Sequence, residues 1–184
     1  MKKIYVFLAD GFEEIEALTV VDIARRAGID TTVVSINDDE AVTGAHNILV
    51  KADTVFDKVD WSKCDMIVLP GGGPGTVNLR NHDELMKKVD EFNAAGKKIA
   101  AICAAPAKIL GDKGLLKGKK AICFPGLENL MEGATRVECG AITDGNIITG
   151  CAMGTAIDFA LEIVKSISGE DKAAEMAKQI VYRK

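Results

Sequence analysis

The sequence predicts an α/β protein in which helices cover both faces of a mainly parallel β-sheet. The first observation is a set of short apolar runs that are typical of buried strands, namely Lys3–Ala9, Thr31–Ile36, Asp65–Leu69 and Ile99–Ile102. The second is that helical patterns occur between these runs, and strands that alternate with helices form parallel sheets. The third is that glycines or Asp/Asn-rich turns end most of the segments.

In the first half of the chain, a helix is predicted over Glu13–Ala27, directly after the first strand. The segment Val42–Val50 is irregular and has the pattern of a short hairpin. A second helix is predicted over His82–Ala95, with Asn81 as its N-cap and Glu84 at the capping-box position.

In the second half, Asp144-Gly145 is a strong turn signal, and we expect Val137–Cys139 to pair with Asn146–Thr149 around it. The other expected elements are a helix from Ala105 to Leu110, a strand Lys119–Phe124, a helical stretch Leu127–Met131, and helices Thr155–Ile167 and Asp171–Val181. Because there is no repeat, low-complexity tract or linker, residues 1–184 are predicted to form a single domain.

The composition excludes several classes of protein. Hydrophobic residues make up 48% and charged residues 27% of the 184 residues, and the net charge of −4 argues against a nucleic-acid surface. The apolar run Ile4–Ala9 is too short for a signal peptide or a membrane span, so we expect a cytoplasmic protein. Five cysteines without a CxxC or a Cys/His cluster predict free thiols, with neither a disulfide framework nor a zinc site.

Cys103 is the first candidate for chemistry. It follows the buried strand Ile99–Ile102 and precedes Ala104, Ala105 and Pro106, so it lies at a sharp strand-to-helix turn, the geometry of a nucleophile elbow. The positive end of a helix dipole favours a thiolate there. The alternative is a buried structural cysteine that packs as a small apolar residue.

A glycine-rich loop, Pro70–Gly75, follows the strand Asp65–Leu69 and should lie at the same edge of the sheet as Cys103. The backbone amides of Gly72 and Ala104 together form a candidate oxyanion hole. The loop lacks the patterns of nucleotide-phosphate binding, and its alternative interpretation is a plain tight turn.

Glu16 is the third candidate, because helical projection places it within the apolar stripe of the first helix, whereas Glu14 falls on another face. A carboxyl group in such a stripe is unfavourable unless it is protonated or hydrogen-bonded. It would then serve as a proton donor and acceptor beside the Cys103 thiol. The alternative is a charge that reaches solvent at the end of the stripe.

With these residues in view, the chain resembles the DJ-one/ThiJ/PfpI superfamily, in its DJ-one-like branch. The matching motifs are FLADGFEEIEA, VLPGGGPG, AAICAAP and GTAIDFAL, which together span residues 7–161. The resemblance implies a flavodoxin-like three-layer α/β/α sandwich and a homodimer. We expect neither a cofactor nor a metal. The resemblance also implies that Cys103 is an oxidation-prone nucleophile beside a protonated Glu16, with the Gly72 and Ala104 amides near its sulfur.

Three positions depart from the family pattern. Phe124 replaces a histidine found in several members, and Ala104 replaces the histidine of the protease members, so neither residue completes a Cys–His dyad and the protease interpretation is rejected. Residues 151–154 read Cys-Ala-Met-Gly in place of an Arg-Gly-Pro-Gly stretch, so an anion-binding arginine is absent.

The remaining candidates are weaker. His46 is either a site residue acting across a dimer interface or a solvated loop residue, and Cys151 is either a resolving thiol or a packing residue. Residues to which we assign no chemical role are His82, Cys64, Cys123, Asp53, Asp57 and Asp60.

Two functions compete most closely. In the first, the protein is a glyoxalase- or deglycase-like enzyme whose Cys103 attacks reactive α-oxoaldehydes or their adducts, with Glu16 moving the proton. In the second, it is a non-enzymatic redox sensor or chaperone whose Cys103 oxidises to sulfinic acid. A third interpretation is a holdase in which Cys103 only packs.

Overall fold

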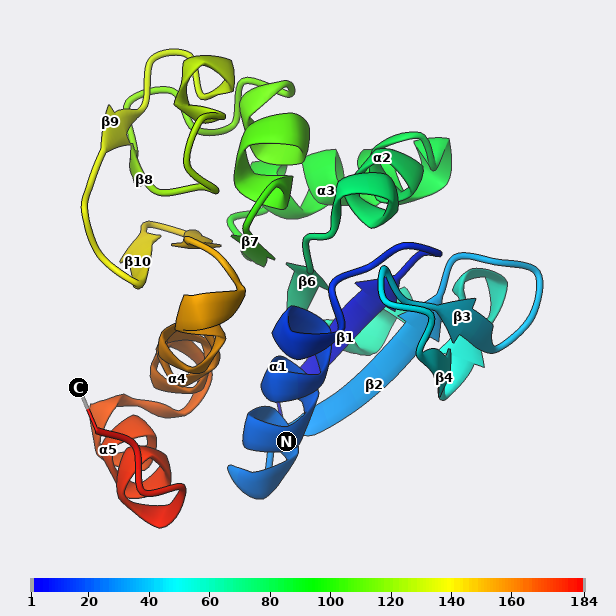
Figure 1. Ribbon diagram of the computed structural model, residues 1–184, viewed down its shortest axis with the longest axis horizontal. Coiled ribbons are helices and arrows are strands. Elements are labelled where there is room, and N and C mark those ends of the chain that lie inside the picture. Colours follow the sequence, from blue (N-terminus) through cyan, green and yellow to red (C-terminus); the bar gives the residue numbers. More distant parts are fainter. Residues whose placement is uncertain (1, 184) are drawn as a thin grey trace.

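A computed structural model describes residues 2–183, so residues 1 and 184, the ends of the predicted domain, lie outside the described residues. Its centre is a seven-stranded sheet in the order β10-β11-β7-β6-β1-β2-β5 (Figure 1). The strands are β1 (Lys3–Leu8), β2 (Asp30–Ser35), β5 (Thr54–Val55), β6 (Met66–Leu69), β7 (Lys98–Ile102), β10 (Ala141–Asp144) and β11 (Ile147–Gly150).

All neighbouring strands of this sheet run parallel except the edge strand β10, which pairs antiparallel with β11. The two form a hairpin whose turn contains Gly145 with a φ of 62°, a conformation that glycine adopts without steric strain. The parallel strands β1, β6 and β7 are buried along almost their whole length, because helices cover them on both faces.

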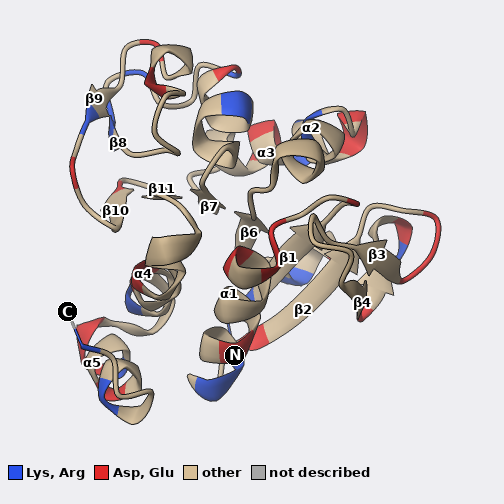
Figure 2. Ribbon diagram, in the orientation of Figure 1, with Lys and Arg blue, Asp and Glu red and all other residues tan. Residues whose placement is uncertain are grey.

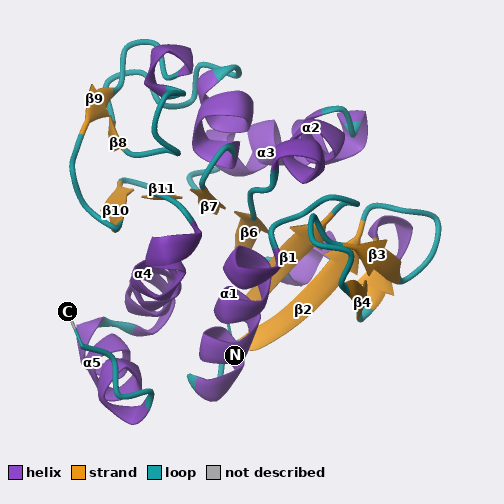
Figure 3. Ribbon diagram, viewed as in Figure 1, coloured by secondary structure: helices purple, strands orange, loops and turns teal. Residues whose placement is uncertain are grey.

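The helices form two layers around the sheet (Figures 1 and 3). One layer contains α1 (Glu14–Arg26), α4 (Ala156–Ser168) and α5 (Glu170–Gln179), which contribute to one apolar cluster. The other contains α2 (Gly73–Arg80), α3 (Asp83–Ala94) and a π-helix (Pro106–Gly111), whose buried residues belong to the second cluster. This three-layer α/β/α sandwich confirms the predicted flavodoxin-like class.

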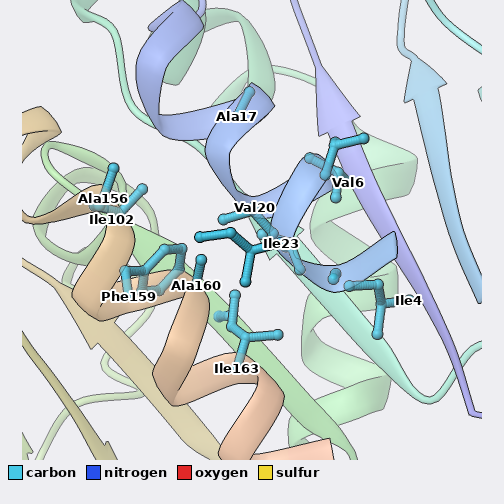
Figure 4. Packing of buried hydrophobic residues seen from close by; sticks show 14 of the residues in the cluster. Ile4, Val6, Ala17, Val20, Ile23, Ile102, Ala156, Phe159, Ala160 and Ile163 are labelled. Carbon is cyan, nitrogen blue, oxygen red and sulfur yellow. The ribbon is translucent and has the colours of Figure 1, made fainter. Parts of the chain in front are cut away.

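The contact between α1 and α4 fixes the start of α1 above the sheet. Figure 4 shows Val20 and Ile23 of α1 facing Phe159 and Ile163 of α4, with Ile102 of β7 near the start of α4. All five side chains are almost completely inaccessible to solvent. The packing therefore holds the first turn of α1 over the carboxyl end of β7, where Cys103 follows.

The prediction of a loop and a helix between residues 70 and 95 is partly wrong. The glycine-rich stretch starts a helix, α2, at Gly73, although Gly and Pro are unfavourable in most helix positions. Pro74 is tolerated because the first turn needs no N–H from it. The N-cap of α3 is His82 and not Asn81: the His82 Nδ1 accepts a hydrogen bond from the Leu85 amide, so Glu84 forms no capping box.

The segment between β7 and β11 also differs from the prediction. The first hairpin strand is Ala141–Asp144 instead of Val137–Cys139. The strand expected over Lys119–Phe124 is limited to β8 (Lys120–Ala121), which pairs with β9 (Thr135–Arg136), and Leu127–Met131 contains only a 3-10 turn, Glu128–Leu130. Because β8 and β9 pair with each other outside the central sheet, the local apolar pattern alone predicts this segment poorly.

The irregular segment near residue 45 forms the expected hairpin, with β3 (Ala41–Thr43) and β4 (Leu49–Lys51). It lies against the start of α1: the Ala45 amide donates to the Phe12 carbonyl and the Gly11 amide donates to the Thr43 carbonyl. Figure 2 shows acidic residues at this end of α1. Among residues 2–183, no helix has both the length and the apolar character that crossing a bilayer requires.

Candidate functional site

Cys103 occupies the turn between β7 and the following helical segment. Its φ is 65°, a left-handed backbone conformation that is uncommon for residues with a side chain. Two backbone hydrogen bonds hold this conformation, from the Cys103 amide to the Gly150 carbonyl and from the Phe124 amide to the Cys103 carbonyl. Residues held in such strained geometry concentrate at functional sites, which supports the elbow interpretation of this turn.

Glu16 lies beside this turn and is completely buried, as the apolar stripe predicted. Its Oε2 accepts a hydrogen bond of 2.8 Å from the Gly71 amide, whereas its Oε1 has no hydrogen-bond partner among the described residues. Burial, the largest influence, raises the pKa of the Glu16 carboxyl to about 7. Near neutral pH this group therefore exchanges a proton readily.

Gly71 joins Glu16 to Cys103, and the sequence pattern did not single it out within its loop. A Cβ at this position would lie 2.5 Å from Glu16 Oε2, 2.6 Å from Cys103 Cβ and 3.0 Å from Cys103 Sγ. The acid and the sulfur thus approach each other across a position that only glycine can fill. A repeated glycine after a buried strand is the sequence signal, but it does not tell which glycine makes the close approach.

The backbone amides of Gly72 and Ala104, the candidate oxyanion-hole donors, both lie near the Cys103 sulfur. Both backbone N–H groups donate toward the Cys103 sulfur and act to lower the thiol pKa. Two donors directed at one atom can stabilise negative charge on that sulfur, or on an oxygen bonded to it. Gly72 has a φ of 92°, a backbone conformation that favours glycine.

The expectation of a readily ionised thiol is not supported. Burial, followed by the charge and hydrogen bonding of Glu16, raises the pKa of the Cys103 thiol to about 12. Cys103 is buried, with only 7% of the residue exposed, so its thiol is poorly hydrated. Because an ionised Glu16 opposes ionisation of the thiol, the pair retains one proton above about pH 7, and the thiolate forms when that proton moves to Glu16.

Two further residues lie in the segments whose backbone bonds to the Cys103 turn. Phe124 stands at the position where several family members have histidine. Its backbone amide donates a hydrogen bond to the Cys103 carbonyl, and 40% of the residue is exposed. Cys151 follows Gly150, and its Sγ lies 3.7 Å from the Cys123 carbonyl oxygen. Burial raises the pKa of the Cys151 thiol, so this residue has the environment of a packing cysteine.

His46 does not lie free in solvent. Its Nδ1 is 2.8 Å from Glu14 Oε2, and its backbone amide donates to Glu14 Oε1 at 2.7 Å. Glu14, which the helical projection placed on another face, is 95% buried because the β3–β4 hairpin covers it. Donor atoms of Glu13, Glu14 and His46 lie within 4.8 Å of one another, a spacing that can hold a metal ion.

Several residues to which we assigned no chemical role make packing, capping or ion-pair contacts in the structure. Burial raises the pKa of the Cys64 thiol to about 12, and His82 caps α3 while its ring packs on Phe56. Asp53 forms an ion pair with Arg25, and Asp60 accepts from the Ser62 amide.

Comparison with known proteins identifies relatives along nearly the whole chain. The profile of the DJ-1/PfpI family matches residues 2–166. Two Arabidopsis thaliana proteins, DJ-1 homologs B and A, are 40% and 37% identical over 99% of this chain. The chain spans less than half of their length, 42% and 47%.

Two other relatives match over most or all of both chains. A protein of Pyrococcus horikoshii named as a deglycase is 30% identical over 89% of this chain and 98% of its own length. The solved structure of oxidised Toxoplasma gondii DJ-1 is 35% identical, covers 100% of both chains and superimposes with a TM-score of 0.95.

Proposed function

Because the chain belongs to the DJ-1/PfpI family, we propose that it is a stress-protective protein whose Cys103 reacts with small carbonyl electrophiles, in the manner of a glyoxalase or deglycase. The observation that carries this proposal is the contact of Glu16 and Cys103 across Gly71, with a Glu16 pKa of about 7. A deglycase among the relatives is consistent with it.

The chemistry starts from a thiol and an ionised carboxylate. As Cys103 Sγ bonds to the aldehyde carbon of an α-oxoaldehyde, its proton passes to Glu16 and then to the former carbonyl oxygen, which gives a hemithioacetal. The Gly72 and Ala104 amides stabilise the negative charge that develops there. No cofactor is needed for this addition.

The same carboxyl group completes the reaction. Glu16 removes the proton from the carbon bonded to sulfur and returns it to the neighbouring carbon, while the hydroxyl proton on the first carbon passes to the oxygen of the second. The hemithioacetal thereby becomes a thioester of a 2-hydroxy acid. Water then cleaves the carbon–sulfur bond, and the thiol recovers its proton. The overall change adds one water molecule to the oxoaldehyde and consumes no oxidant or reductant.

Lactate release from methylglyoxal tests this proposal. We expect steady production by the wild-type protein and a fall to the uncatalysed background in Cys103→Ala, because the bond to sulfur cannot form. Cys64→Ala is the matched control, since Cys64 is also a buried thiol with a raised pKa but belongs to the opposite end of the sheet. Equal rates in wild type and Cys103→Ala would refute the enzymatic proposal.

A second candidate function, oxidation sensing at Cys103, is favoured by Phe124, which leaves the site without the histidine that several relatives have. Each peroxide molecule that adds an oxygen atom to the sulfur is reduced to water, and two additions give a sulfinate. A protonated Glu16 would donate a hydrogen bond to a sulfinate oxygen, while Gly72 and Ala104 donate to the other.

Peptide mass spectrometry after mild peroxide treatment distinguishes this candidate. We expect two oxygen atoms on Cys103 before the exposed Cys139 is modified, because Cys103 has an adjacent proton acceptor and two directed amides. Modification of Cys139 first, with Cys103 unchanged, would exclude a sensing role.

We also propose that the partner of the chain is a second copy. Apolar side chains that remain exposed cluster on α1, α4 and the β3–β4 hairpin: Ile15, Leu18, Ile48, Leu49 and Ile157. A groove of about 380 Å³ between α1 and α4 continues this surface. Sedimentation equilibrium measures the oligomeric state. We expect the wild-type protein to be a dimer that Ile15→Asp dissociates. A wild-type monomer at micromolar concentration would contradict the proposal.

A further inference from the structure

Two cysteines that are distant in the sequence come together next to the reactive turn. The Cys151 thiol lies against the main chain of Cys123, because its Sγ is 3.7 Å from the Cys123 carbonyl oxygen, to which it donates. The Ile122 amide also donates to Thr149 Oγ1 at 3.0 Å. These two contacts hold the segments that carry the cysteines side by side.

The two thiols share one electrostatic environment. Burial raises the pKa of both, that of Cys123 to about 11. The Glu128 carboxylate raises and the Arg136 guanidinium lowers the pKa of each thiol, and these two groups form an ion pair of 3.2 Å. The charge of Cys151 itself also raises the pKa of Cys123. Such an influence of one thiol on the other requires the two sulfur atoms to lie near each other.

We propose that Cys123 and Cys151 form a reversible disulfide in the presence of a small-molecule disulfide, independently of the function of Cys103. Both are free thiols in this structure, which therefore represents the reduced form of the pair. A disulfide requires the Cβ atoms of its cysteines to be about 4 Å apart. The contact of the Cys151 sulfur with the Cys123 main chain already brings one thiol to the residue that carries the other.

The reaction starts at Cys151, because this residue is partly exposed whereas only 3% of Cys123 is exposed. Neither cysteine belongs to the apolar surface that we assign to a second copy. The Cys151 thiolate attacks one sulfur of glutathione disulfide, and the glutathione that leaves takes up the proton lost by Cys151. The Cys123 thiolate then attacks the Cys151 sulfur and releases the second glutathione, which takes up the proton of Cys123. Two cysteine thiols are thereby oxidised, and one glutathione disulfide is reduced to two thiols.

The disulfide would join the two segments that hold the Cys103 turn. Phe124, the residue after Cys123, donates its amide to the Cys103 carbonyl at 2.7 Å. Gly150, the residue before Cys151, accepts a hydrogen bond of 3.0 Å from the Cys103 amide. A covalent link one residue away from each of these bonds would oppose opening of the turn. The oxidation state of the pair is therefore connected to the conformation of the reactive cysteine.

Peptide mapping after incubation with millimolar glutathione disulfide tests the proposal without any measurement of activity. Trypsin separates Cys103 from Cys123, and further cleavage at Asp144 separates Cys139 from Cys151. We expect most chains to yield a linked Cys123–Cys151 peptide pair, two hydrogen atoms lighter than the sum of the free peptides, that dithiothreitol separates. The link should form equally in Cys103→Ala, so its absence would not be confused with a failure of the proposed function.

The exposed Cys139 provides the matched control, and Cys139→Ser should leave the yield of the link unchanged. Cys123→Ser should stop the reaction at a mixed disulfide between Cys151 and glutathione, whereas Cys151→Ser should leave the buried Cys123 unmodified. A wild-type protein without the Cys123–Cys151 link, whether its Cys151 stays free, keeps glutathione or bonds to Cys103, would overturn the proposal.

Discussion

Glu16→Gln is expected to slow the reaction of Cys103 with methylglyoxal or iodoacetamide at pH 7 by about 100-fold or more, the usual contribution of a positioned proton acceptor. The amide has the shape of the carboxyl and its oxygen can still accept from the Gly71 amide. It cannot, however, take the proton of a thiol whose pKa is about 12. Pseudo-first-order alkylation, with Cys103 identified by peptide mapping, measures the change.

The pH dependence of Cys103 reactivity in the same variant shows whether Glu16 acts as a proton acceptor or has only a structural role. Wild-type reactivity should rise with pH around pH 7 as Glu16 ionises, and the variant should lack this rise. Glu16→Asp, which keeps a carboxyl group, should retain the pH profile at a lower rate. An unchanged alkylation rate in Glu16→Gln would show that the carboxyl takes no proton from Cys103.

The free energy of unfolding should fall as pH rises, whereas the reactivity of Cys103 should increase. Burial raises the pKa of Glu16 from 4.5 to about 7, so the folded state retains a proton that the unfolded state loses as pH rises through this window. The wild-type free energy of unfolding therefore loses about 3 kcal/mol between pH 4.5 and 7 from this group. Denaturant unfolding of wild type and Glu16→Gln should show a difference that grows with pH in favour of the variant.

Gly72→Ala is expected to lower the free energy of unfolding by about 3 kcal/mol, in the range of substitutions that strain the backbone. The φ of 92° at this position disfavours any side chain, and a Cβ there would overlap the Gly11 carbonyl oxygen and lie 2.6 Å from the Glu13 amide nitrogen. Both neighbours are backbone atoms that cannot rotate away. The midpoint of thermal unfolding should fall by roughly 10 °C.

The neighbouring glycine provides the control. A Cβ added at Gly73 would meet no atom within 4 Å, and the residue lies in the first turn of α2, so Gly73→Ala should be neutral or stabilise by up to about 1 kcal/mol. If Gly72→Ala proves as stable as Gly73→Ala, the backbone conformation at the amide that faces Cys103 is not required.

The sheet and its reactive turn could be predicted because each depends on local patterns. Buried parallel strands are continuous apolar runs, and a cysteine between such a run and Ala-Ala-Pro marks the strand-to-helix turn. Glu16 was found because a charge interrupts an apolar stripe. Each of these patterns involves only residues close together in the sequence, so it can be recognised without knowledge of the tertiary structure.

The features that were missed depend on contacts between distant segments. Glu14 is buried because a hairpin about thirty residues later covers it, and no helical projection contains that information. The thiol pKa follows from the desolvation that the surrounding layers impose, which outweighs the local amides that favoured ionisation. The start of α2 at Gly73 similarly depends on the Gly75 amide bond to the Gly11 carbonyl.

The bridge that Gly71 forms between Glu16 and the sulfur has a consequence for biosynthesis. Glu16 is translated long before Cys103, and the close approach needs β1, β6 and β7 to be assembled side by side. A nascent chain that ends before β7 thus carries an ordinary, hydrated glutamate, and the carboxyl acquires its altered affinity for protons only when the central strands associate. The acid–thiol pair is therefore a product of late assembly, which keeps partly synthesised chains from carrying this reactive centre.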